Sequence, residues 1–397
     1  MSAPWLGELP PGWQEISLRY LARVETGSRD TVDAVPGGEY PFIIRSQKPL
    51  EIDTYSYDTE AVLTAGDGAV GEIFHHVDGR FEVHQRVYVM HDFRGMHGRF
   101  FYYYFSSEFG QTVAYGGAQS TVASLRRPMF TGFPVAVPPL DVQRAIAGYL
   151  DRETGQIDAF IAKNKELITL LTERRDSVWS DLYMKAARTA RPVPLRRFVS
   201  SIADGPFGSS LTSAHYSDAG TRVIRLGNIG INEFKAGDEA FVSDEYAATL
   251  TAHAAAAGDV IVAGLGDDRM PLGRACVLPD IGPAIVKADC YRVRPVHGLS
   301  SDFLAWVLSA PPTRGLMKLA ARGSTRERLN TSVVLDVEVP IPDPETQAAL
   351  VRQFASSASR IDVARSVAER GVALARERRG ALISAAVTGK IDVGVSV

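Results

Sequence analysis

Val137-Pro138-Pro139-Leu140-Asp141-Val142-Gln143 opens the segment that decides the fold of this 397-residue chain, and Ile341-Pro342-Asp343-Pro344-Glu345-Thr346-Gln347 opens a second copy of it. Counted from Gln143 to Gln347, the offset between the copies is 204 residues. The same offset relates Ser120-Thr121 to Ser324-Thr325, Leu125 to Leu329 and Ile157-Asp158 to Ile361-Asp362. Solenoid repeats have periods of roughly 20 to 50 residues, so this offset predicts two copies of one module rather than an array.

Each copy continues into a pattern that predicts a helix of more than about forty residues, or roughly 65 Å, which is longer than a domain of this size is wide. Long and apolar side chains recur at steps of four and three, as in the seam of a coiled coil. Larger seam residues in the first helix face smaller ones in the second, which favours pairing of the two helices within one chain; alternatively, each helix caps its own domain. The predicted seam comprises Ile157, Ile161, Asn164, Ile168, Leu171, Arg175, Val178 and Leu182, and Ile361, Arg365, Ala368, Val372, Ala375, Arg379, Leu382 and Ala386.

Short β-type runs broken by glycine precede each helix and predict two domains of one α+β fold. An aromatic helix candidate at Phe100–Phe105 is matched in position by Asp302–Leu308. The expected division is a first domain over 1–140, a long helix over 141–188, a second domain over 189–344, and a long helix with a tail over 345–397. The β-type runs are 40–45, 61–64, 71–74 and 87–90 in the first domain, and 222–226, 259–262, 274–278 and 290–293 in the second.

Composition favours a folded protein of the cytoplasm. Apolar residues make up 45% of the chain, enough for two cores. The two cysteines, Cys276 and Cys290, lie in one half only, which favours free thiols in a reducing compartment. No signal leader precedes Pro10 and no apolar run reaches 18 residues, so we expect neither secretion nor membrane spanning. The net charge of −3 argues weakly against a protein that coats nucleic acid.

Motifs for catalysis, cofactors and metals fail on context. Gly66-Asp67-Gly68-Ala69-Val70-Gly71 matches a dinucleotide fingerprint but leads into a strand-like run instead of a helix. The histidines have no metal-site spacing, and neither a nucleophile elbow nor a Walker lysine occurs. We therefore expect no catalytic residue, no metal ligand and no cofactor bound by this chain.

Polar side chains on loops recur in both halves and have the chemistry of DNA contacts. Arginine reads guanine, glutamine or asparagine reads adenine, and hydroxyl groups hold phosphate oxygens. We align Ile44-Arg45-Ser46-Gln47 with Ile224-Arg225-Leu226-Gly227-Asn228. For any single residue, a solvated loop is the competing interpretation. The predicted DNA contacts are Arg45, Ser46, Gln47, Gln119, Ser120, Thr121, Arg225, Asn228, Ser324, Thr325 and Arg326.

The order of these features resembles a specificity subunit of a type I restriction-modification system. The resemblance covers nearly the whole chain: Leu9-Pro10-Pro11-Gly12-Trp13, the two proline-to-glutamine helix starts, and the ending Val387-Thr388-Gly389-Lys390-Ile391-Asp392. It implies two target recognition domains held apart by an antiparallel helix pair with pseudo-two-fold symmetry. Each domain would read one half of a split site in double-stranded DNA, and the helices would fix the gap. A rod of roughly 65 Å covers about two turns of DNA at ~34 Å each.

The resemblance also implies partners. Two methyltransferase subunits would bind the helical regions, restriction subunits are a further optional partner, and S-adenosylmethionine would be held by the methyltransferase. The chain itself would be non-catalytic. One departure is that the first helix ends at Leu182-Tyr183-Met184-Lys185 without the tail of the second, so the helix ends are not equivalent docking sites. Base-reading residues do not carry over from the family.

Two other functions stay open at this point. A DNA methyltransferase would need an Asn- or Asp-Pro-Pro-aromatic motif, whereas the chain has Val137-Pro138-Pro139-Leu140. A coiled-coil scaffold or adaptor, with two β-rich domains that bind protein or glycan, would fit the negative net charge. Salt-dependent DNA binding that is lost on Arg45→Ala or Arg225→Ala would argue against the scaffold.

Overall fold

The computed structural model describes residues 6–68, 70–115, 125–267, 270–321 and 327–393. The chain forms two compact units, Met1–Lys165 with Glu369–Val397 and Glu166–Ala368. We call them unit 1 and unit 2. Each unit contains one domain and a part of each of two long helices, α3 (Leu140–Thr189) and α8 (Pro344–Val387). The mixed α+β class is confirmed.

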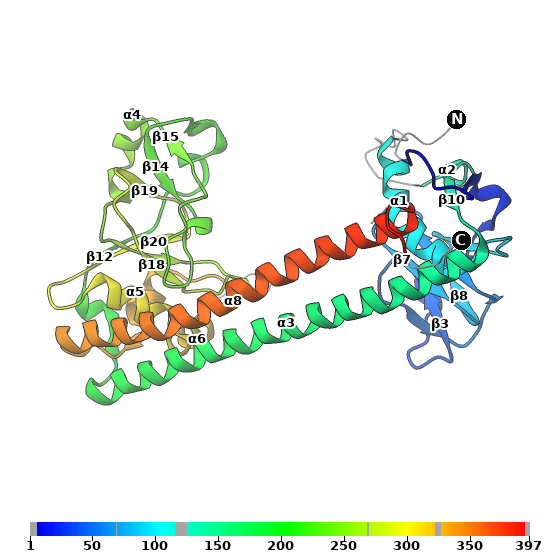
Figure 1. The fold of residues 1–397 in the computed structure, drawn as a ribbon. Helices are drawn as coiled ribbons and strands as arrows, with labels where there is room; N and C mark the ends of the chain where they lie inside the picture. The colour runs from blue at the N-terminus through cyan, green and yellow to red at the C-terminus, as the bar shows by residue number, and fades with distance from the viewer. Residues whose placement is uncertain (1–5, 69, 116–124, 268–269, 322–326, 394–397) are drawn as a thin grey trace. The chain divides into compact units, whose positions relative to one another are not determined.

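The domain of unit 1 contains two four-stranded sheets (Figure 1). The first has the order β2-β9-β6-β7 and is antiparallel throughout, and α1 (Gly98–Tyr115) packs on β6 and β7. The second has the order β4-β3-β8-β5, with β3 and β8 parallel. The strands are β2 (Arg23–Thr26), β3 (Tyr40–Ile43), β4 (Leu50–Ile52), β5 (Tyr57–Asp58), β6 (Ala61–Ala65), β7 (Phe74–Val77), β8 (Arg80–Val83) and β9 (Val87–His91). The run predicted over 71–74 becomes a strand only at Phe74, because Gly71 has a φ of 77° in a turn.

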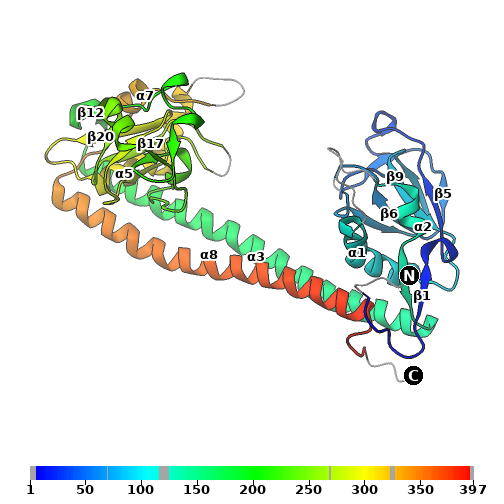
Figure 2. The same cartoon turned by 90° about the horizontal axis from the view of Figure 1, so that it is seen from above.

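The domain of unit 2, drawn with β12, β17 and β20 labelled in Figure 2, has the same topology with one further strand, β13. Its sheet β12-β20-β17-β18 corresponds to β2-β9-β6-β7, and in β13-β15-β14-β19-β16 the strands β14 and β19 are parallel, as β3 and β8 are. Helix α5 (Ser301–Ser309) packs on β17 and β18 as α1 packs on its sheet. The strands are β12 (Val199–Ala203), β13 (Tyr216–Ser217), β14 (Thr221–Ile224), β15 (Phe241–Val242), β16 (Ala254–Ala255), β17 (Val260–Ala263), β18 (Ala275–Val277), β19 (Ala284–Val286) and β20 (Cys290–Pro295).

A short two-stranded sheet leads into each long helix. It pairs β1 (Gln14–Ser17) with β10 (Pro134–Val137) in unit 1, and β11 (Val193–Pro194) with β21 (Glu338–Val339) in unit 2. The remaining α-helices are α2 (Arg127–Thr131), α4 (Asp244–Ala247), α6 (Pro311–Ala320) and α7 (Thr331–Asp336). Short 3-10 helices lie at Leu18–Tyr20, Thr31–Asp33, Leu195–Phe198, Gly208–Ser210, Ser213–His215, Leu226–Asn228 and Ala248–His253.

A buried glutamine fixes the start of each long helix in the same way. Gln143 donates through Nε2 to the carbonyl groups of Gly95 and Pro138 and accepts at Oε1 from the N–H of His97. Gln347 makes the same three bonds with Gly298, Pro342 and Ser300. Both side chains are fully buried. A buried amide without partners is costly, so these two residues connect each helix to its own domain at a defined place.

The two long helices also contact each other, and they are antiparallel within each unit. In unit 1, Asp158 of α3 accepts from Nε and Nη2 of Arg379 of α8 at 2.9 and 3.2 Å. In unit 2, Asp362 of α8 pairs with Arg175 of α3 at 3.2 Å. Asp362 lies 204 residues after Asp158, and Arg379 lies 204 residues after Arg175. The two ion pairs therefore join equivalent positions of the repeat, with the aspartate on α3 in unit 1 and on α8 in unit 2.

All sixteen predicted seam residues are at least partly buried, although other residues of both helices, such as Trp179 and Phe354, are buried as well. Ile157, Ile161, Leu182, Ala368, Val372 and Ala386 are buried, and the other ten are half-buried. Unit 2 adds an aromatic cluster beside the seam, where Trp179 packs on Phe354 with ring centroids 4.3 Å apart. Arg175 lies over both rings, with Cζ 5.2 and 5.4 Å from their centroids. Full burial of one large apolar side chain stabilises a fold by about 1.5–3 kcal/mol, so this cluster anchors both helices in unit 2.

The end of α8 packs on the beginning of the chain inside unit 1. Gly389 ends the helix with a φ of 72°, while Lys390 N–H donates to Ala385 and Gly389 N–H to Ala386, the two bonds of a Schellman motif. A Cβ on Gly389 would lie 2.4 Å from Cγ of Pro10. Leu9, Trp13 and Ile391 pack on the core of unit 1. The two terminal signatures are therefore parts of one packed structure.

Candidate nucleic-acid interface

Three loops of the first domain meet at the turn after β6. The N–H of Leu125 donates to the carbonyl of Gly66 at 2.8 Å. The N–H of Gly66 donates to the carbonyl of Arg86, which precedes β9, also at 2.8 Å. Arg45, in the loop after β3, reaches the same turn through Asp67. Backbone bonds thus bring distant loops together at one place.

Two arginines share one carboxylate at this junction. Nη1 of Arg45 donates to Oδ1 of Asp67 at 2.6 Å, and Nη1 of Arg86 donates to Oδ2 at 2.9 Å. Burial alone would raise the pKa of the Asp67 carboxyl, but the two arginines outweigh it and hold that pKa below its ordinary value. The Asp67 side chain is 19% exposed, against 39% for Arg45 and 60% for Arg86. The guanidinium groups are therefore accessible, whereas the carboxylate lies beneath them.

The second domain has the same three-loop junction. The N–H of Leu329 donates to the carbonyl of Gly264, as Leu125 does to Gly66. The phenol of Tyr291 donates to the carbonyl of Leu329 at 2.5 Å, and that of Tyr88 donates to Leu125 at 3.3 Å. The junction is thus a property of the repeated fold and does not depend on the side chains that each copy presents.

The alignment of the first loop with its copy was wrong by one residue. The N–H of His84 donates to the carbonyl of Ile43, and the N–H of Lys287 donates to that of Ile224. Ile224 therefore corresponds to Ile43, and Arg225 takes the place of Ile44 rather than of Arg45. Sequence similarity alone could not resolve this shift, because the parallel pairing of β3 with β8 and of β14 with β19 sets the register.

Arg225 and Asn228, the predicted contacts of the second domain, have different roles. Arg225 pairs with Asp238 and keeps its side chain one-third exposed. Asn228 is fully buried, where it donates to the carbonyl groups of Lys235 and Asp238 and accepts from the N–H of Arg225. All of its hydrogen-bonding groups are used to hold a turn. Its assignment as a DNA contact is therefore corrected to a structural one.

Arg328 is an exposed cation at the junction of the second domain. It pairs with Asp289 at 2.6 Å and lies over the ring of Phe207, with Cζ 5.0 Å from the ring centroid. Burial raises the pKa of the neighbouring Asp204 to about 6, against the lowering effect of hydrogen bonds from the N–H groups of Gly205 and Asp289. The junction thus holds two carboxyl groups beneath one arginine.

Arg86 and Arg328 belong to this surface although neither was among the predicted contacts. Asp67 pairs with cations because it is largely buried, and this burial is not visible in the sequence Gly66-Asp67-Gly68. Six predicted contacts lie outside the described residues, namely Gln119, Ser120, Thr121, Ser324, Thr325 and Arg326. Ser46 is half-buried, and its carbonyl oxygen lies 2.9 Å from Nε2 of His75.

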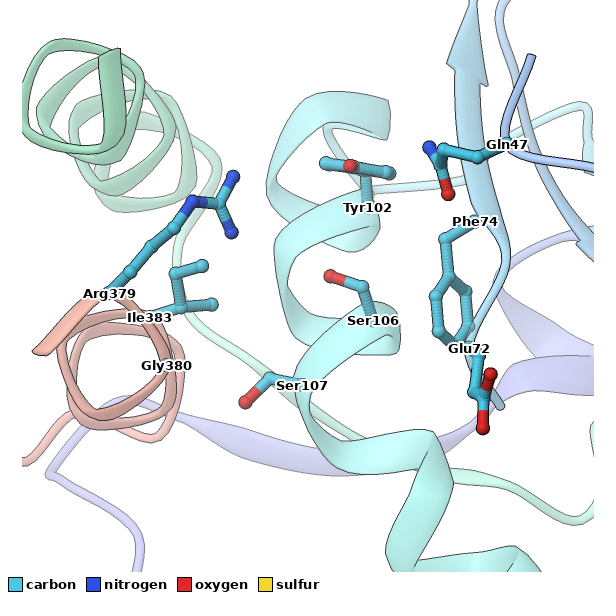
Figure 3. Close-up of a pocket in the computed structure, with 9 residues that line it drawn as sticks. All are labelled: Gln47, Glu72, Phe74, Tyr102, Ser106, Ser107, Arg379, Gly380 and Ile383. Atoms are coloured by element: carbon cyan, nitrogen blue, oxygen red, sulfur yellow. The ribbon is translucent and has the colours of Figure 1, made fainter. Parts of the chain in front are cut away.

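Gln47 lines a cavity of about 340 Å³ in unit 1. Figure 3 shows Arg379 and Ile383 of α8 on one side, Tyr102, Ser106 and Ser107 of α1 in the middle, and Gln47 beyond them. Glu72 and Phe74 complete the lining, with Gly380 on α8. The cavity connects the first loop of the domain with the long helix. Gln47 itself is exposed.

The features expected to be inert have structural explanations. Gly66 and Gly68 form the turn between β6 and the following loop, and Gly68 has a φ of 76°. Cys276 and Cys290 are buried free thiols, and burial raises the pKa of Cys276 to about 12. Among the described residues, no group of three or more histidine, cysteine or acidic side chains could hold a metal ion. No helix within the described ranges is long and apolar enough to cross a membrane.

Comparison with known proteins points to one family. Residues 10–170 match the family model described as type I restriction modification DNA specificity domain. The type I restriction enzyme EcoDI specificity subunit of Escherichia coli is 28% identical over 172 residues, which are 43% of this chain and 38% of that protein. The MjaVIII specificity subunit of Methanocaldococcus jannaschii is 19% identical over 283 residues, 67% of this chain and 64% of that protein. The matches thus span less than two thirds of these relatives.

A solved structure resembles this one over nearly the full length. It comes from work on complex assembly and conformational transition of the type I R-M system. The likeness covers 97% of this chain and 100% of the other, with a TM-score of 0.65 and 15% sequence identity. At this identity the likeness shows a shared fold.

Proposed function

Because residues 10–170 match the family model described as type I restriction modification DNA specificity domain, we propose that this chain is the non-catalytic specificity subunit of a type I restriction-modification complex. Each domain reads one half of a bipartite site in double-stranded DNA. The long helices α3 and α8 form an antiparallel coiled coil that sets the gap between the halves.

The observation that carries this proposal is the repetition of the module down to individual hydrogen bonds. Gln143 and Gln347 make the same three bonds, and the two sheets with equivalent strand order support equivalent loop junctions. Two similar domains on one chain suit a site with two separate halves. The reciprocal pairs Asp158–Arg379 and Arg175–Asp362 support pseudo-two-fold symmetry of the helix pair.

The chemistry of the two junctions supports DNA as the ligand. Arg45 and Arg86 in one domain and Arg328 in the other are accessible guanidinium groups, the type that binds phosphate and guanine. The carboxylates that pair with these arginines are less exposed than the arginines. A chain with a net charge of −3 can therefore still present positive charge at its surface here. The two junctions differ in side chains, which supports different half-sites.

Partner subunits supply the chemistry in this proposal. Two methyltransferase subunits dock on the helices, hold S-adenosylmethionine and methylate adenine, and restriction subunits are an optional addition in the cytoplasm. Exposed apolar side chains on the helices, such as Phe160, Leu170 and Leu374, suit docking of other proteins.

Those same apolar side chains favour the second candidate, a scaffold whose domains bind protein or glycan. The two functions differ in their response to DNA. Long-read methylation mapping of a cell that expresses this chain with its methyltransferase tests the first one. We expect methylated adenines within a split motif that disappears when this chain is absent. Methylation without a split motif that depends on this chain would contradict it.

A further inference from the structure

The arrangement of Arg45 and Arg86 around Asp67 points to a particular part of DNA. Each guanidinium uses one nitrogen, Nη1, and each contacts a different oxygen of the same carboxylate. A guanine edge would instead be read by two N–H groups of a single arginine. Two cations that converge on two oxygens of one anion match the non-bridging oxygens of a phosphodiester group. The shape and charge of Asp67 resemble those of a backbone phosphate.

The surroundings keep the two cations in place while leaving them accessible. The backbone of Arg86 is fixed on both sides, because its N–H donates to Nδ1 of His84 at 3.0 Å and its carbonyl accepts from Gly66. The Gly68 residue that follows Asp67 has a φ of 76°, a conformation that glycine adopts without strain. Asp67 therefore lies in a turn of defined geometry below two partly exposed guanidinium groups.

We propose that Arg45 and Arg86 form a clamp for one DNA backbone phosphate, and that Asp67 occupies the place of that phosphate in the DNA-free chain. This inference rests on the proposed DNA-binding function. Arg45 and Arg86 carry two positive charges against the one negative charge of Asp67, so the clamp attracts a second anion. Both guanidinium groups are partly exposed, so solvent weakens their pairing with Asp67 and favours the exchange of carboxylate for phosphate.

Among the described residues, the positions equivalent to Arg86 and Asp67 do not form this clamp in the second domain. The equivalent of Arg86 in the second domain is Asp289. His84 and Lys287 donate to equivalent carbonyl groups, those of Ile43 and Ile224, and Arg86 and Asp289 each lie two residues further on. Position 265, next to Gly264, is a leucine where the first domain has Asp67. The second domain therefore places an acid where the first places a cation, and that acid is paired with the guanidinium of Arg328.

Substitution of Asp67 tests the exchange. Purified full-length chain is titrated with a fluorescein-labelled mixed-sequence duplex at several KCl concentrations, and binding is followed by anisotropy. Asp67→Asn removes the internal competitor, so we expect affinity to rise about two- to five-fold. The rise should vanish when Arg45→Ala and Arg86→Ala are added to Asp67→Asn. Unchanged or weaker binding by a folded Asp67→Asn variant would overturn the proposal.

The salt dependence tests whether both arginines hold one phosphate. The slope of log affinity against log salt changes by about 0.9 for each phosphate neutralised. Arg45→Ala, Arg86→Ala and the double variant should each reduce the slope by about 0.9, because they remove the same contact. A reduction twice as large in the double variant, or none in any variant, would overturn the clamp. If Asp67→Asn does not fold, the salt dependence of the arginine variants still tests the phosphate clamp.

A duplex of A·T pairs only separates phosphate from guanine. We expect the arginine variants to lose the same fraction of affinity for this duplex as for the mixed one. A loss confined to the mixed duplex would assign the arginines to guanine and overturn the phosphate clamp. Arg80→Ala is the matched control, since Arg80 is half-exposed and paired with Asp58 at 3.0 Å, and it should change neither affinity nor slope.

Thermal unfolding of each variant identifies any that fail to fold. If the wild-type chain binds neither duplex at low salt, the proposed DNA-binding function fails, and the clamp fails with it. If the wild type binds both duplexes and the clamp variants behave as the wild type, the clamp alone fails.

Discussion

Single carboxyl groups control the local chemistry at both loop junctions. Asp67 lies under two arginines and has a lowered pKa, whereas Asp204 lies beside Asp289 and has a raised one. The difference arises from the neighbours, because cations favour the charged form while burial and a second acid oppose it. At similar backbone turns, the carboxyl group of Asp67 therefore stays charged between two arginines, whereas that of Asp204 holds its proton more tightly.

Asp204 should make unit 2 less stable as the pH rises through about 6. Its pKa of about 6 exceeds its ordinary value of 3.8, so the folded chain binds this proton more tightly than the unfolded chain. Its stabilising contribution is therefore full below about pH 4 and is lost as the pH rises through about 6. Asp204→Asn keeps a carbonyl acceptor for the N–H groups of Gly205 and Asp289 and has no charge. Because Asp204 is half-buried, we expect a gain of about 1 kcal/mol at pH 7.5.

Melting temperatures of the wild type and Asp204→Asn between pH 4 and 8 measure this effect. The two curves should meet near pH 4 and separate above pH 6, with the variant higher. Parallel curves across this range would contradict the assignment.

Gly389 should tolerate no side chain. Alanine there must adopt a φ of 72° and would place Cβ 2.4 Å from Cγ of Pro10. We expect Gly389→Ala to cost about 2–4 kcal/mol, the sum of left-handed backbone strain and overpacking. Gly12→Ala is the control, since Gly12 has a φ of 82° with no atom within 4 Å of its added Cβ. Equal losses of melting temperature in both variants would show that Pro10 does not confine Gly389.

The helices show which elements can be predicted from sequence. The steps of four and three predicted two long helices, and six of the predicted seam residues are buried; Trp179 and Phe354, which are also buried, were not among them. The glutamines at positions 143 and 347 marked both helix starts. The contact between Arg175 and the rings of Trp179 and Phe354 could not be predicted, since it depends on a distant residue brought close by the antiparallel pairing.

Arg175 and Arg379 form a natural comparison, because each is the counterpart of the other in the repeat. Arg175 is 16% exposed and packs on two rings, whereas Arg379 is 34% exposed. Exposed ion pairs contribute about 0.2–1 kcal/mol, and cation–π contacts about 2 when desolvated. Arg379→Ala should therefore cost under about 1 kcal/mol and Arg175→Ala about 2–3. Urea unfolding measures both, and equal costs would contradict a role for the aromatic cluster.

At the scale of the whole molecule, the duplication could be predicted and the details of the site could not. The constant offset of 204 residues from Leu125 through the long helices predicted two related modules, whereas the loops before it differ in length, since Ile43 and Ile224 are only 181 residues apart. The alignment of the loops of one domain with those of the other could not be predicted as well, as the one-residue error at Arg225 shows. Burial of Asn228 was equally hidden, because an asparagine in a loop has the same chemistry for a turn as for a base.

Exchange of the first domain tests independent reading by the two domains. Residues 1–140 would be replaced by the corresponding domain of a related subunit, with Gln143 and both long helices kept. Long-read methylation mapping in cells that contain the methyltransferase then compares the two motifs. Our account predicts that one half of the split motif changes while the other half and the gap stay the same. A change in both halves, or a motif without two halves, would contradict it.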